Sequence, residues 1–429
     1  MTGRRAVVVG AGVIGCAIGL ELTRAGFAVT VVDRNSAPGL GSTSASSAIV
    51  RYHYRHLAEA VVAWESGLRW RDWENYLGVC DPVGMARFIR TGLLVLPGQA
   101  LEMTEACAHL TALGIEWERL DSDGIAQRLP ALEPGVLGPP CREDDTEFWT
   151  EPRPGAVGYW MPDCGYVDDP QLAAANLAHA AVQGGANFRF STEVVEVARR
   201  SGRVAGVALA DERTIDADVV VNAAGPWSHA LNEIAGVLDD FVTDTRPLEQ
   251  EILVLPAPPG FTDGHGCAVT DGDFGTYFRP HLGNTLVVGG MEPECDPLRW
   301  LDDPSQARPR LSAETGRLQA LRVARRIPGA GIPPRTQGIV GVYDVTDDWI
   351  PIYDQTNLDG YYVAIGTSGH GFKQAPFVGT MMATLIAACE AGHPHDADPV
   401  LVPAPASGHP VDLGHFSRRR VVRTQSAMG

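Results

Sequence analysis

The N-terminal segment AVVVGAGVIG, residues 6–15, constrains the fold more than any other part of the sequence. Its apolar start predicts a buried strand, and its glycines, in G-x-G-x-x-G spacing, predict a tight turn into a helix. A second apolar run, Ala28 to Val32, follows the helix and ends at Asp33. Strand, glycine turn, helix and strand together predict a dinucleotide-binding unit. A glycine-rich turn without a ligand is the alternative, and the flanking elements and the terminal acid weigh against it.

The residues of this motif have separate expected roles. Gly10 makes the tight turn, Gly12 lets the backbone approach a pyrophosphate, and Gly15 lets the helix pack closely on the strand. The N-terminus of the helix stabilises the phosphates. Asp33 lies about 20 residues beyond the glycines, where an acid accepts hydrogen bonds from both hydroxyls of a ribose. Because a carboxylate disfavours a 2′-phosphate, Asp33 favours FAD or NAD over NADP.

Length and composition limit the class of protein. A chain of 429 residues exceeds one ordinary hydrophobic core, so we expect two domains. The formal net charge of −18 argues against nucleic acid and anionic membranes as partners. No apolar run approaches the ~20 residues of a membrane span. Arg4 and Arg5 precede a strand of the nucleotide fold rather than a secretory leader, so we expect a cytoplasmic protein.

The cysteines and the lysine are both informative. The eight cysteines include no C-x-x-C pair, which favours reduced thiols over a disulfide framework or a zinc site, and we expect no metal. Of the 34 basic residues, Lys373 is the one lysine. A compositional bias towards arginine explains this scarcity, and it draws attention to the lysine that remains.

The rest of the chain alternates between helical and strand patterns. We expect helices over 58–76, 101–113, 170–183 and 312–327, the third of them capped by Asp169 and stopped by Gly184. Strand patterns occupy 91–96, 188–190, 194–199, 204–209 and 217–222, and alternating segments suited to an antiparallel sheet occupy 246–295. We expect residues 130–157 to form a long loop, and the tail from about 396 to be partly disordered.

A second glycine-rich turn lies near the end of the chain. The segment YYVAIGTSGHGFK, residues 361–373, predicts a strand, a glycine-rich turn and the start of a helix. The chain is therefore expected to return to the nucleotide fold after the antiparallel segments.

In their order and spacing, the motifs of this chain resemble those of a family of FAD-dependent amine and amino-acid oxidoreductases. This family includes monomeric sarcosine oxidase, the sarcosine oxidase β subunit, dimethylglycine dehydrogenase and D-amino-acid oxidase. The resemblance runs from residue 5 to about 390. It rests on GAGVIG with Asp33, GSTSASSAIVR, MPDCGYVDDPQL, TEVVEV, VVVNAAGPWS, TYFRP and GVYDVTDDWIPI followed by VAIGTSGHGFK.

The resemblance implies an α/β fold in two parts that are interleaved along the chain. A Rossmann-like FAD-binding domain would consist of residues 1–85, 158–245 and 334–395. A second, substrate-binding domain built on an antiparallel sheet would consist of residues 86–157 and 246–333. Residues 396–429 would form a C-terminal tail.

The resemblance also implies which residues contact FAD. Ser42 and Thr43 would lie near the pyrophosphate and Val194 beside the adenine. The turn from Gly369 to Lys373 would lie at the pyrimidine edge of the flavin, where backbone N–H groups stabilise the negative charge of the reduced ring. The expected FAD contacts are Gly10, Gly12, Val13, Ile14, Gly15, Asp33, Arg34, Ser42, Thr43, Val194, Ala224, Gly225, Trp227, Gly366, Gly369, His370, Gly371, Phe372 and Lys373.

Four residues match positions at which the family binds its substrate. Arg51 would offer a planar fork to a carboxylate, and Lys373 would supply a point charge from the opposite side. Tyr277 and Tyr343 match tyrosines that line the substrate pocket. Ordinary surface or core roles are the alternative for all four.

The sequence departs from the family at positions with particular chemistry. Monomeric sarcosine oxidase attaches its flavin through a cysteine, and the matching residue here is Gly341. Residues 35–51 lack the histidine that dimethylglycine dehydrogenase uses. We therefore expect non-covalent FAD. Val287 and Met291 stand where some oxidases have an oxygen-activating lysine and a histidine, so we do not expect fast reaction with oxygen.

The implied activity is FAD-dependent oxidation of an amino acid by hydride transfer to flavin N5, giving an imine that is hydrolysed. The favoured substrate is a secondary or tertiary N-alkyl amino acid similar to sarcosine or dimethylglycine. The partners would be this small amine with a carboxylate, and oxygen or another electron acceptor. A D- or L-amino-acid dehydrogenase or oxidase, a flavin subunit of a multi-chain complex, and an NADPH-fed flavin hydroxylase are alternatives. The assembly, homo-oligomeric or hetero-oligomeric, stays open, and no general base is nominated.

Overall fold

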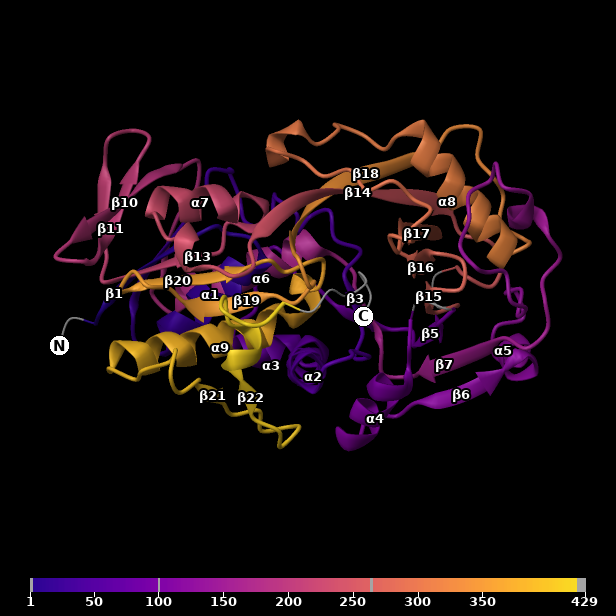
Figure 1. Cartoon of the computed structure of the whole chain (residues 1–429), viewed down its shortest axis with the longest axis horizontal. Helices are drawn as coiled ribbons and strands as arrows, with labels where there is room; N and C mark the ends of the chain where they lie inside the picture. The colour runs from indigo at the N-terminus through magenta and orange to yellow at the C-terminus, as the bar shows by residue number, and fades with distance from the viewer. Residues whose placement is uncertain (1–2, 99–100, 263–264, 423–429) are drawn as a thin grey trace.

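A six-stranded sheet forms the centre of one half of the molecule (Figure 1). The computed structural model describes residues 3–98, 101–262 and 265–422. The strand order is β19-β20-β13-β1-β2-β9, and all neighbours are parallel except β19 and β20. The strands are β1 (Arg5–Val9), β2 (Ala28–Val32), β9 (Asn187–Arg189), β13 (Val219–Asn222), β19 (Ile352–Gln355) and β20 (Tyr361–Ile365). The central strands are runs of buried valine, as in parallel sheets that are covered on both faces.

Alternate residues of β1 point into two separate cores. Val8 packs with the helices α1 (Val13–Arg24), α6 (Pro170–Gln183) and α9 (Gly371–Glu390) on one face of the sheet. Val7 packs on the other face, with a second group of elements. These are β10 (Val194–Arg200), β11 (Arg203–Leu209), β12 (Thr214–Asp216) and α7 (Ser228–Ala235). This half has the expected Rossmann-like layering of helices, parallel sheet and a small antiparallel sheet.

The helix boundaries follow from local signals in the sequence. Asp169 caps α6 by accepting the N–H of Leu172 at 2.9 Å, and Gly185 continues the chain with φ +105° after the helix. The predicted helix 58–76 forms as α2 (Leu57–Arg71) and α3 (Trp73–Leu77), with a break at Asp72, where φ is −121°. The other helices are α4 (Thr104–Ala112), α5 (Ser122–Arg128) and α8 (Ala313–Arg326).

An eight-stranded sheet organises the other half (Figure 1). Its order is β18-β14-β17-β16-β15-β5-β7-β6, and its pairs are antiparallel apart from β15 with β5. The strands are β5 (Leu93–Leu96), β6 (Glu118–Asp121), β7 (Val157–Met161), β14 (Thr245–Pro256), β15 (Ala268–Asp271), β16 (Thr276–His281), β17 (Thr285–Gly290) and β18 (Gln337–Thr346). Leu94, Leu253 and Val288 belong to the core between this sheet and α8. The expected antiparallel second sheet is confirmed.

Two strands of this sheet lie outside the segments expected to form the substrate-binding domain. β7 starts at residue 157 and β18 spans 337–346, within the segments 158–245 and 334–395 that were expected in the FAD-binding domain. Both pair within the eight-stranded sheet instead. The chain therefore passes between the halves along β7 and β18, and the domain boundaries themselves stay a prediction.

The segment after α9 packs against the first half of the molecule. Residues 396–422 include β21 (Leu401–Val402), β22 (Val411–Asp412) and the 3₁₀ turn Leu413–Phe416. The expected partial disorder is wrong for this stretch, because Val402 and Phe416 are completely buried and Arg418 is held by carboxylates. A tail that is anchored by a few side chains lacks the periodicity on which the prediction relied. Residues 423–429 lie outside the described part.

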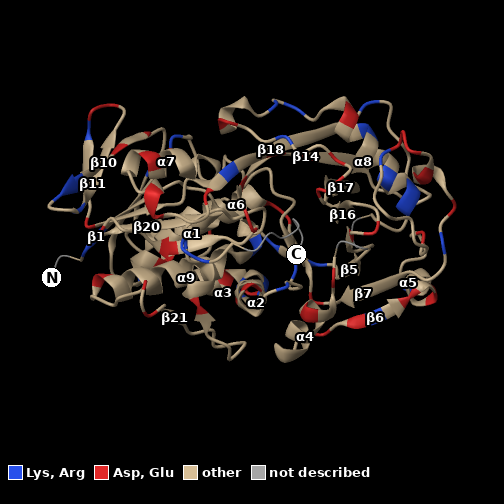
Figure 2. Cartoon of the chain, in the orientation of Figure 1, with Lys and Arg blue, Asp and Glu red and all other residues tan. Residues whose placement is uncertain are grey.

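Short elements complete the chain. β3 (Ile49–Val50), β8 (Gly165–Val167) and β4 (Phe88–Arg90) form a three-stranded sheet where the two halves meet. The expected long loop 130–157 is irregular apart from an isolated antiparallel bridge between Val136 and Arg153, the 3₁₀ turn Thr146–Trp149 and the first residue of β7. The eight cysteines are free thiols. Within the described ranges, no helix is long and apolar enough to cross a lipid bilayer. Acidic and basic residues are interspersed over both halves (Figure 2).

Candidate active site

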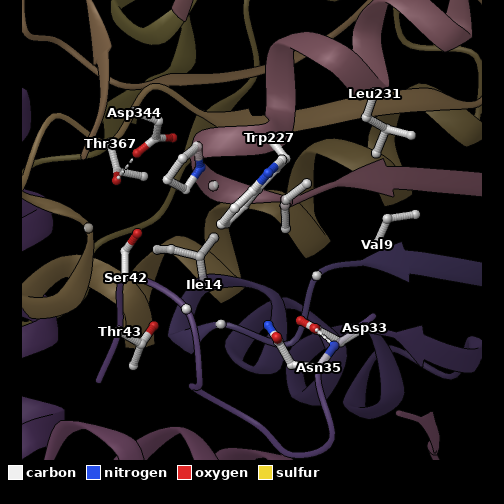
Figure 3. Close-up of a pocket in the computed structure, with 18 of the residues that line it drawn as sticks. Val9, Ile14, Asp33, Asn35, Ser42, Thr43, Trp227, Leu231, Asp344 and Thr367 are labelled. Atoms are coloured by element: carbon white, nitrogen blue, oxygen red, sulfur yellow. Dashed lines mark hydrogen bonds between the residues drawn. The ribbon is translucent and has the colours of Figure 1, made fainter. Parts of the chain in front are cut away.

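A long cavity runs past the carboxyl ends of β1, β2 and β13 to the N-terminus of α9 (Figure 3). Ligands of open α/β sheets bind in this position. The predicted FAD contacts that line it are Gly10, Gly12, Val13, Ile14, Asp33, Arg34, Ser42, Thr43, Val194, Ala224, Gly225, Trp227, Gly369, Gly371 and Phe372. His370 and Lys373 line a second cavity. Gly15 and Gly366 lie outside the linings of both cavities.

The glycines of the first motif divide into two roles. A Cβ at Gly10 would lie 2.3 Å from the oxygen of Ala223, and one at Gly15 would lie 1.9 Å from the oxygen of Gly10. These two glycines therefore allow the strand, turn and helix to pack. A Cβ at Gly12 would meet one atom within 4 Å, the Oγ1 of Thr43 at 3.3 Å. Gly12 thus keeps the cavity open at the start of α1, which fits a pyrophosphate close to the backbone.

The carboxylate of Asp33 is held at the end of β2 by two backbone groups (Figure 3). Its Oδ2 accepts the N–H of Ala11 at 2.7 Å, and its Oδ1 accepts the N–H of Asn35 at 2.7 Å. Each carboxylate oxygen has more than one lone pair, so both can still accept from a ligand. A fixed acceptor pair at the wall of the cavity fits the diol of a ribose.

The middle of the cavity is bounded by hydroxyls and an aromatic ring. Thr43 accepts the N–H of Val13 at 3.0 Å, which satisfies one free donor of α1, and Ser42 donates to the oxygen of Val342 at 2.5 Å. On the opposite wall the guanidinium of Arg34 lies 4.0 Å from the ring centroid of Trp227. This contact fixes the indole beside the cavity.

Asp344 is a buried acid at the far end of the cavity, and sequence reasoning did not single it out. Its Oδ1 accepts the hydroxyl of Thr367 at 2.8 Å, and its Oδ2 has no partner among the described residues (Figure 3). Burial raises the pKa of Asp344. An unpaired buried oxygen is costly unless a ligand satisfies it. The residues along this cavity, from Asp33 to Asp344, therefore fit FAD with its flavin end near α9.

A second cavity adjoins the first and shares Ser46, Tyr343, Gly369 and Phe372 with it. All four residues that sequence analysis assigned to the substrate line this second cavity: Arg51, Tyr277, Tyr343 and Lys373. They come from segments far apart in the chain, which meet where the two halves of the molecule join. Their roles toward a substrate are proposals.

Arg51 and Lys373 are buried cations in one cavity. Arg51 is 6% exposed and Lys373 is 7% exposed. Arg51 donates to the oxygen of His53 at 2.6 Å, and its guanidinium lies 4.7 Å from the ring centroid of Tyr54. The ammonium nitrogen of Lys373 lies 3.4 Å from the oxygen of Gly369. Burial and the charge of Arg51 hold the pKa of Lys373 well below its usual range. A bound anion would offset the burial of Lys373 and the charge of Arg51, and so would raise the pKa of Lys373.

An irregularity in α9 fixes the backbone of Lys373. Pro376 lies within the helix and cannot donate a hydrogen bond. Side chains of α2 bind the carbonyl groups around it: Trp70 donates to the oxygen of Lys373 at 2.9 Å, and Ser66 donates to the oxygen of Gln374 at 2.7 Å. The first turn of α9 is therefore anchored on α2.

The two tyrosines face each other across strands of the eight-stranded sheet. Their hydroxyls influence each other's titration, and burial raises the pKa of Tyr277 to about 12 and that of Tyr343 well above its usual range. Both phenols are therefore neutral at physiological pH. They offer hydroxyls that can donate or accept hydrogen bonds inside the cavity.

Glu292 and Glu59 are acids near the cations that sequence reasoning missed. Glu292 follows β17, lines the second cavity, and has a backbone φ of +49°. Burial raises its pKa to about 8, an effect that the nearby side chain of Gln250 partly offsets. Glu59, on α2, is buried near Arg51 and Lys373, and burial raises its pKa to about 8. Glu292 adjoins Met291, but no pattern in the sequence shows that its carboxyl group is buried.

Residues 5–385 match a family model described as FAD dependent oxidoreductase. D-amino acid dehydrogenase 2 of Ralstonia nicotianae is 26% identical over 89% of this chain and 96% of its own length. Glycine oxidase of Geobacillus kaustophilus is 25% identical over 88% of this chain and 92% of its own length. The crystal structure of L-proline dehydrogenase from P. horikoshii covers 91% of this chain and 95% of its own, with a TM-score of 0.73 and 22% identity.

These similarities span both halves of the molecule. The family resemblance, the fold class and the FAD cofactor predicted from the sequence are confirmed. The chain belongs to the family of FAD-dependent oxidoreductases.

Proposed function

We propose that this oxidoreductase oxidises the carbon next to the nitrogen of a small amino acid, with the second cavity as the substrate site. The observation that carries this proposal is the pair of buried basic side chains, Arg51 and Lys373, in one cavity. A bound carboxylate would favour the charged form of Lys373, so this site is selective for an anion although the chain as a whole has a net charge of −18. A carboxylate fits the planar fork of Arg51 and the point charge of Lys373.

The second cavity supports this chemistry through orientation. When bound, FAD accepts the hydride. Arg51 and Lys373 would bind the carboxylate and so place the adjacent carbon near Tyr343 and Gly369, which line both cavities. Fixing the reacting carbon in this way accounts for a large share of the rate that such a site can provide. Tyr277 would donate or accept a hydrogen bond beside the amine.

Glu292 is the group that would hold the proton of the substrate ammonium. A nitrogen must be neutral for its lone pair to assist hydride loss from the neighbouring carbon. A carboxylate that takes the ammonium proton becomes a neutral acid, and the amine becomes neutral in the same step. Glu292 lines the cavity, and its pKa of about 8 suits this exchange at mildly alkaline pH, where the carboxylate form is populated.

We favour a secondary or tertiary N-alkyl amino acid as the substrate, in line with the motifs of the sequence. A primary amino acid is the second candidate, because D-amino acid dehydrogenases and a glycine oxidase are among the relatives by name. An acceptor other than oxygen is favoured by Val287 in place of a lysine. We propose a cytoplasmic location, because the eight cysteines are free thiols, as in a reducing compartment.

Anaerobic bleaching of the flavin tests the proposal directly. The holoenzyme is mixed with N-methyl, D- and L-amino acids, and each acid is matched with the corresponding amine that lacks the carboxylate. We expect bleaching at 450 nm, the flavin absorbance band, by one class of amino acid and by none of the matched amines. Equal bleaching by an amine and its amino acid would refute the carboxylate site. Bleaching by NADPH alone would support the hydroxylase instead.

A further inference from the structure

The residues Ser417 to Arg420, here called the C-terminal clasp, fasten the end of the described chain to carboxylates from distant segments. The family match ends at residue 385, so the clasp lies beyond the matched region. Arg418 is completely buried and pairs with Asp240, Asp354 and Asp396. Its guanidinium donates to Asp354 at 2.9 Å and to both oxygens of Asp396 at 2.8 and 2.9 Å. This contact anchors the clasp.

Arg420, two residues after Arg418, binds the loop between β18 and β19, which spans residues 347–351. Arg420 donates to both carboxylate oxygens of Asp348, at 2.8 and 2.6 Å, and to the oxygens of Ile350 and Pro351 at 2.6 and 3.2 Å. The side chains of Arg420 and Asp348 are 7% and 1% exposed. A bidentate, buried pair with two further carbonyl contacts fixes the geometry of this loop.

Asp348 in turn organises the loop from within. Its Oδ1 accepts the N–H of Ile350 at 3.2 Å and the hydroxyl of Thr346 at 3.3 Å. Trp349, between these residues, has a φ of +60°, which is unusual for a bulky side chain and persists where the surroundings enforce it. Trp349 lines the second cavity, beside Arg51 and Lys373.

Glu59 is a buried acid on α2 whose charged neighbours include residues of the cavity and of the clasp. It has electrostatic interactions with Arg51 and Lys373, and also with Arg420 and Asp348. His415, in the turn that leads into the clasp, also interacts with Arg420 and Asp348.

We propose that Arg420 is a positioning residue for the substrate cavity: through Asp348 it holds Trp349 as a wall of that cavity and so limits the size of the amino acid admitted. The proposal rests on the proposed function for the nature of the substrate. The wall itself depends only on the contacts of Arg420, Asp348 and Trp349.

The test compares Arg420→Met with Arg419→Gln in the FAD-loaded protein. Arg419 belongs to the same clasp and pairs with Asp240 and Asp396, but it is half-exposed and has no contact with Asp348. In Arg420→Met we expect amide hydrogen exchange of residues 344–351 to be at least several-fold faster, because the loop opens locally. In Arg419→Gln we expect wild-type exchange in this segment.

Turnover gives the second readout. In Arg420→Met we expect KM for the best small amino acid to rise about tenfold while kcat changes less than about threefold, and discrimination against larger side chains to weaken. Arg420→Lys should recover part of the loss, because it keeps the charge but not the bidentate contact. If Arg420→Met does not fold, the double variant Arg420→Gln with Asp348→Asn leaves no charge buried and serves in its place.

The outcomes separate this inference from the proposed function. Wild-type protein that oxidises no amino acid would refute the proposed function, while faster exchange of 344–351 in Arg420→Met would still support the wall. Active wild type with equal exchange, KM and size selectivity in Arg420→Met and Arg419→Gln would refute the positioning role of Arg420.

Discussion

Lys373 is a buried amine whose charge depends on what lies beside it. Burial and Arg51 hold its pKa well below the usual range, so the neutral form is populated at a lower pH than for an exposed lysine. A neutral amine is a nucleophile, and this chain has no other lysine. We therefore predict that an amine-reactive acylating reagent inactivates the enzyme by modifying Lys373, with the α-amino terminus as the competing site.

Ligands provide the control for this prediction. A bound carboxylate raises the pKa of Lys373 and blocks the reagent, so acetate should protect the enzyme, whereas methylamine should not. Lys373→Met should keep FAD and lose affinity for the carboxylate by roughly 1.5–3 kcal/mol, about tenfold to a hundredfold. Peptide mapping decides the matter: complete acylation of Lys373 with unchanged turnover of the best amino acid would show that it does not bind the carboxylate.

Glu292 leads to a prediction about pH. Because burial raises its pKa to about 8, the carboxylate form that accepts a proton is depleted below that pH and complete above it. Wild-type kcat/KM should therefore rise with pH and level off above about 8. In Glu292→Gln the amine must arrive neutral, so kcat/KM should keep rising towards the pKa of the amine, ~10.4 for an alkyl amine.

The loss of kcat/KM in Glu292→Gln, relative to the wild type, should also depend on pH. Near pH 8 about 0.4% of such an amine is neutral and about half of Glu292 is ionised, so we predict a deficit in kcat/KM on the order of a hundredfold that shrinks as the pH approaches 10. Steady-state kinetics between pH 6.5 and 10 measure it. A deficit that is constant across this range would assign Glu292 a purely structural role.

At the residue scale, the sequence singles out residues that belong to a recognisable motif. It does not single out acids whose pKa is raised by burial in the folded protein. Asp33, Arg51 and Lys373, which their motifs singled out, line the walls of the two cavities, and their roles stay predictions. The pKa values of Asp344 and Glu292 are raised because neighbouring segments exclude water from these acids. A single sequence records which acids are present but not which of them are desolvated.

In the turn between β1 and α1, at one end of the cofactor cavity, one glycine serves cofactor binding and another serves packing. Gly12 faces the cavity and Gly15 faces the backbone of Gly10. We predict that Gly12→Val yields folded protein without FAD, because its side chain occupies the place of the pyrophosphate. Gly15→Val should not yield folded protein, because its Cβ would lie 1.9 Å from the oxygen of Gly10.

Circular dichroism and flavin absorbance of the purified variants test this pair. Asp33→Ala is a further control: it keeps the turn intact and removes the acceptor for the ribose, so it too should fold and lack stable FAD. Wild-type flavin content in either Gly12→Val or Asp33→Ala would mean that the cofactor lies elsewhere.

Elements that carry apolar periodicity and capping residues were predicted well from the sequence. A segment that is held in place by a few long-range side-chain contacts was not. α6 begins after Asp169 and ends before Gly184, as its capping signals indicate. The tail after α9 gave no such signal, and its order depends on Arg418 and three aspartates from separate segments. Long-range ion pairs leave no local pattern in a sequence, so the prediction of disorder was wrong there.

On the scale of the whole molecule, the two halves meet around the two cavities. Whether FAD is covalently linked depends on which residues of both halves face the cofactor cavity. Gly341, on β18, would place a Cβ 2.8 Å from the Cβ of Ala45. It therefore offers neither a thiol nor free space for one. We predict that the protein purifies yellow and that acid precipitation releases all of its FAD. Flavin that stays with the denatured polypeptide on a gel would contradict this.

The last prediction concerns the electron acceptor. Transfer of the first electron to oxygen creates a superoxide anion, which a cation beside the flavin stabilises. Val287, on β17, is buried and uncharged, and the two cations of the second cavity are engaged while a carboxylate product is bound. We therefore expect reduced enzyme with a bound carboxylate to react slowly with oxygen and readily with a phenazine or quinone. Stopped-flow reoxidation in air-saturated buffer measures both rates. A rate with oxygen that equals the rate with the artificial acceptor would show that the cations of the cavity, or another group, suffice for oxygen activation.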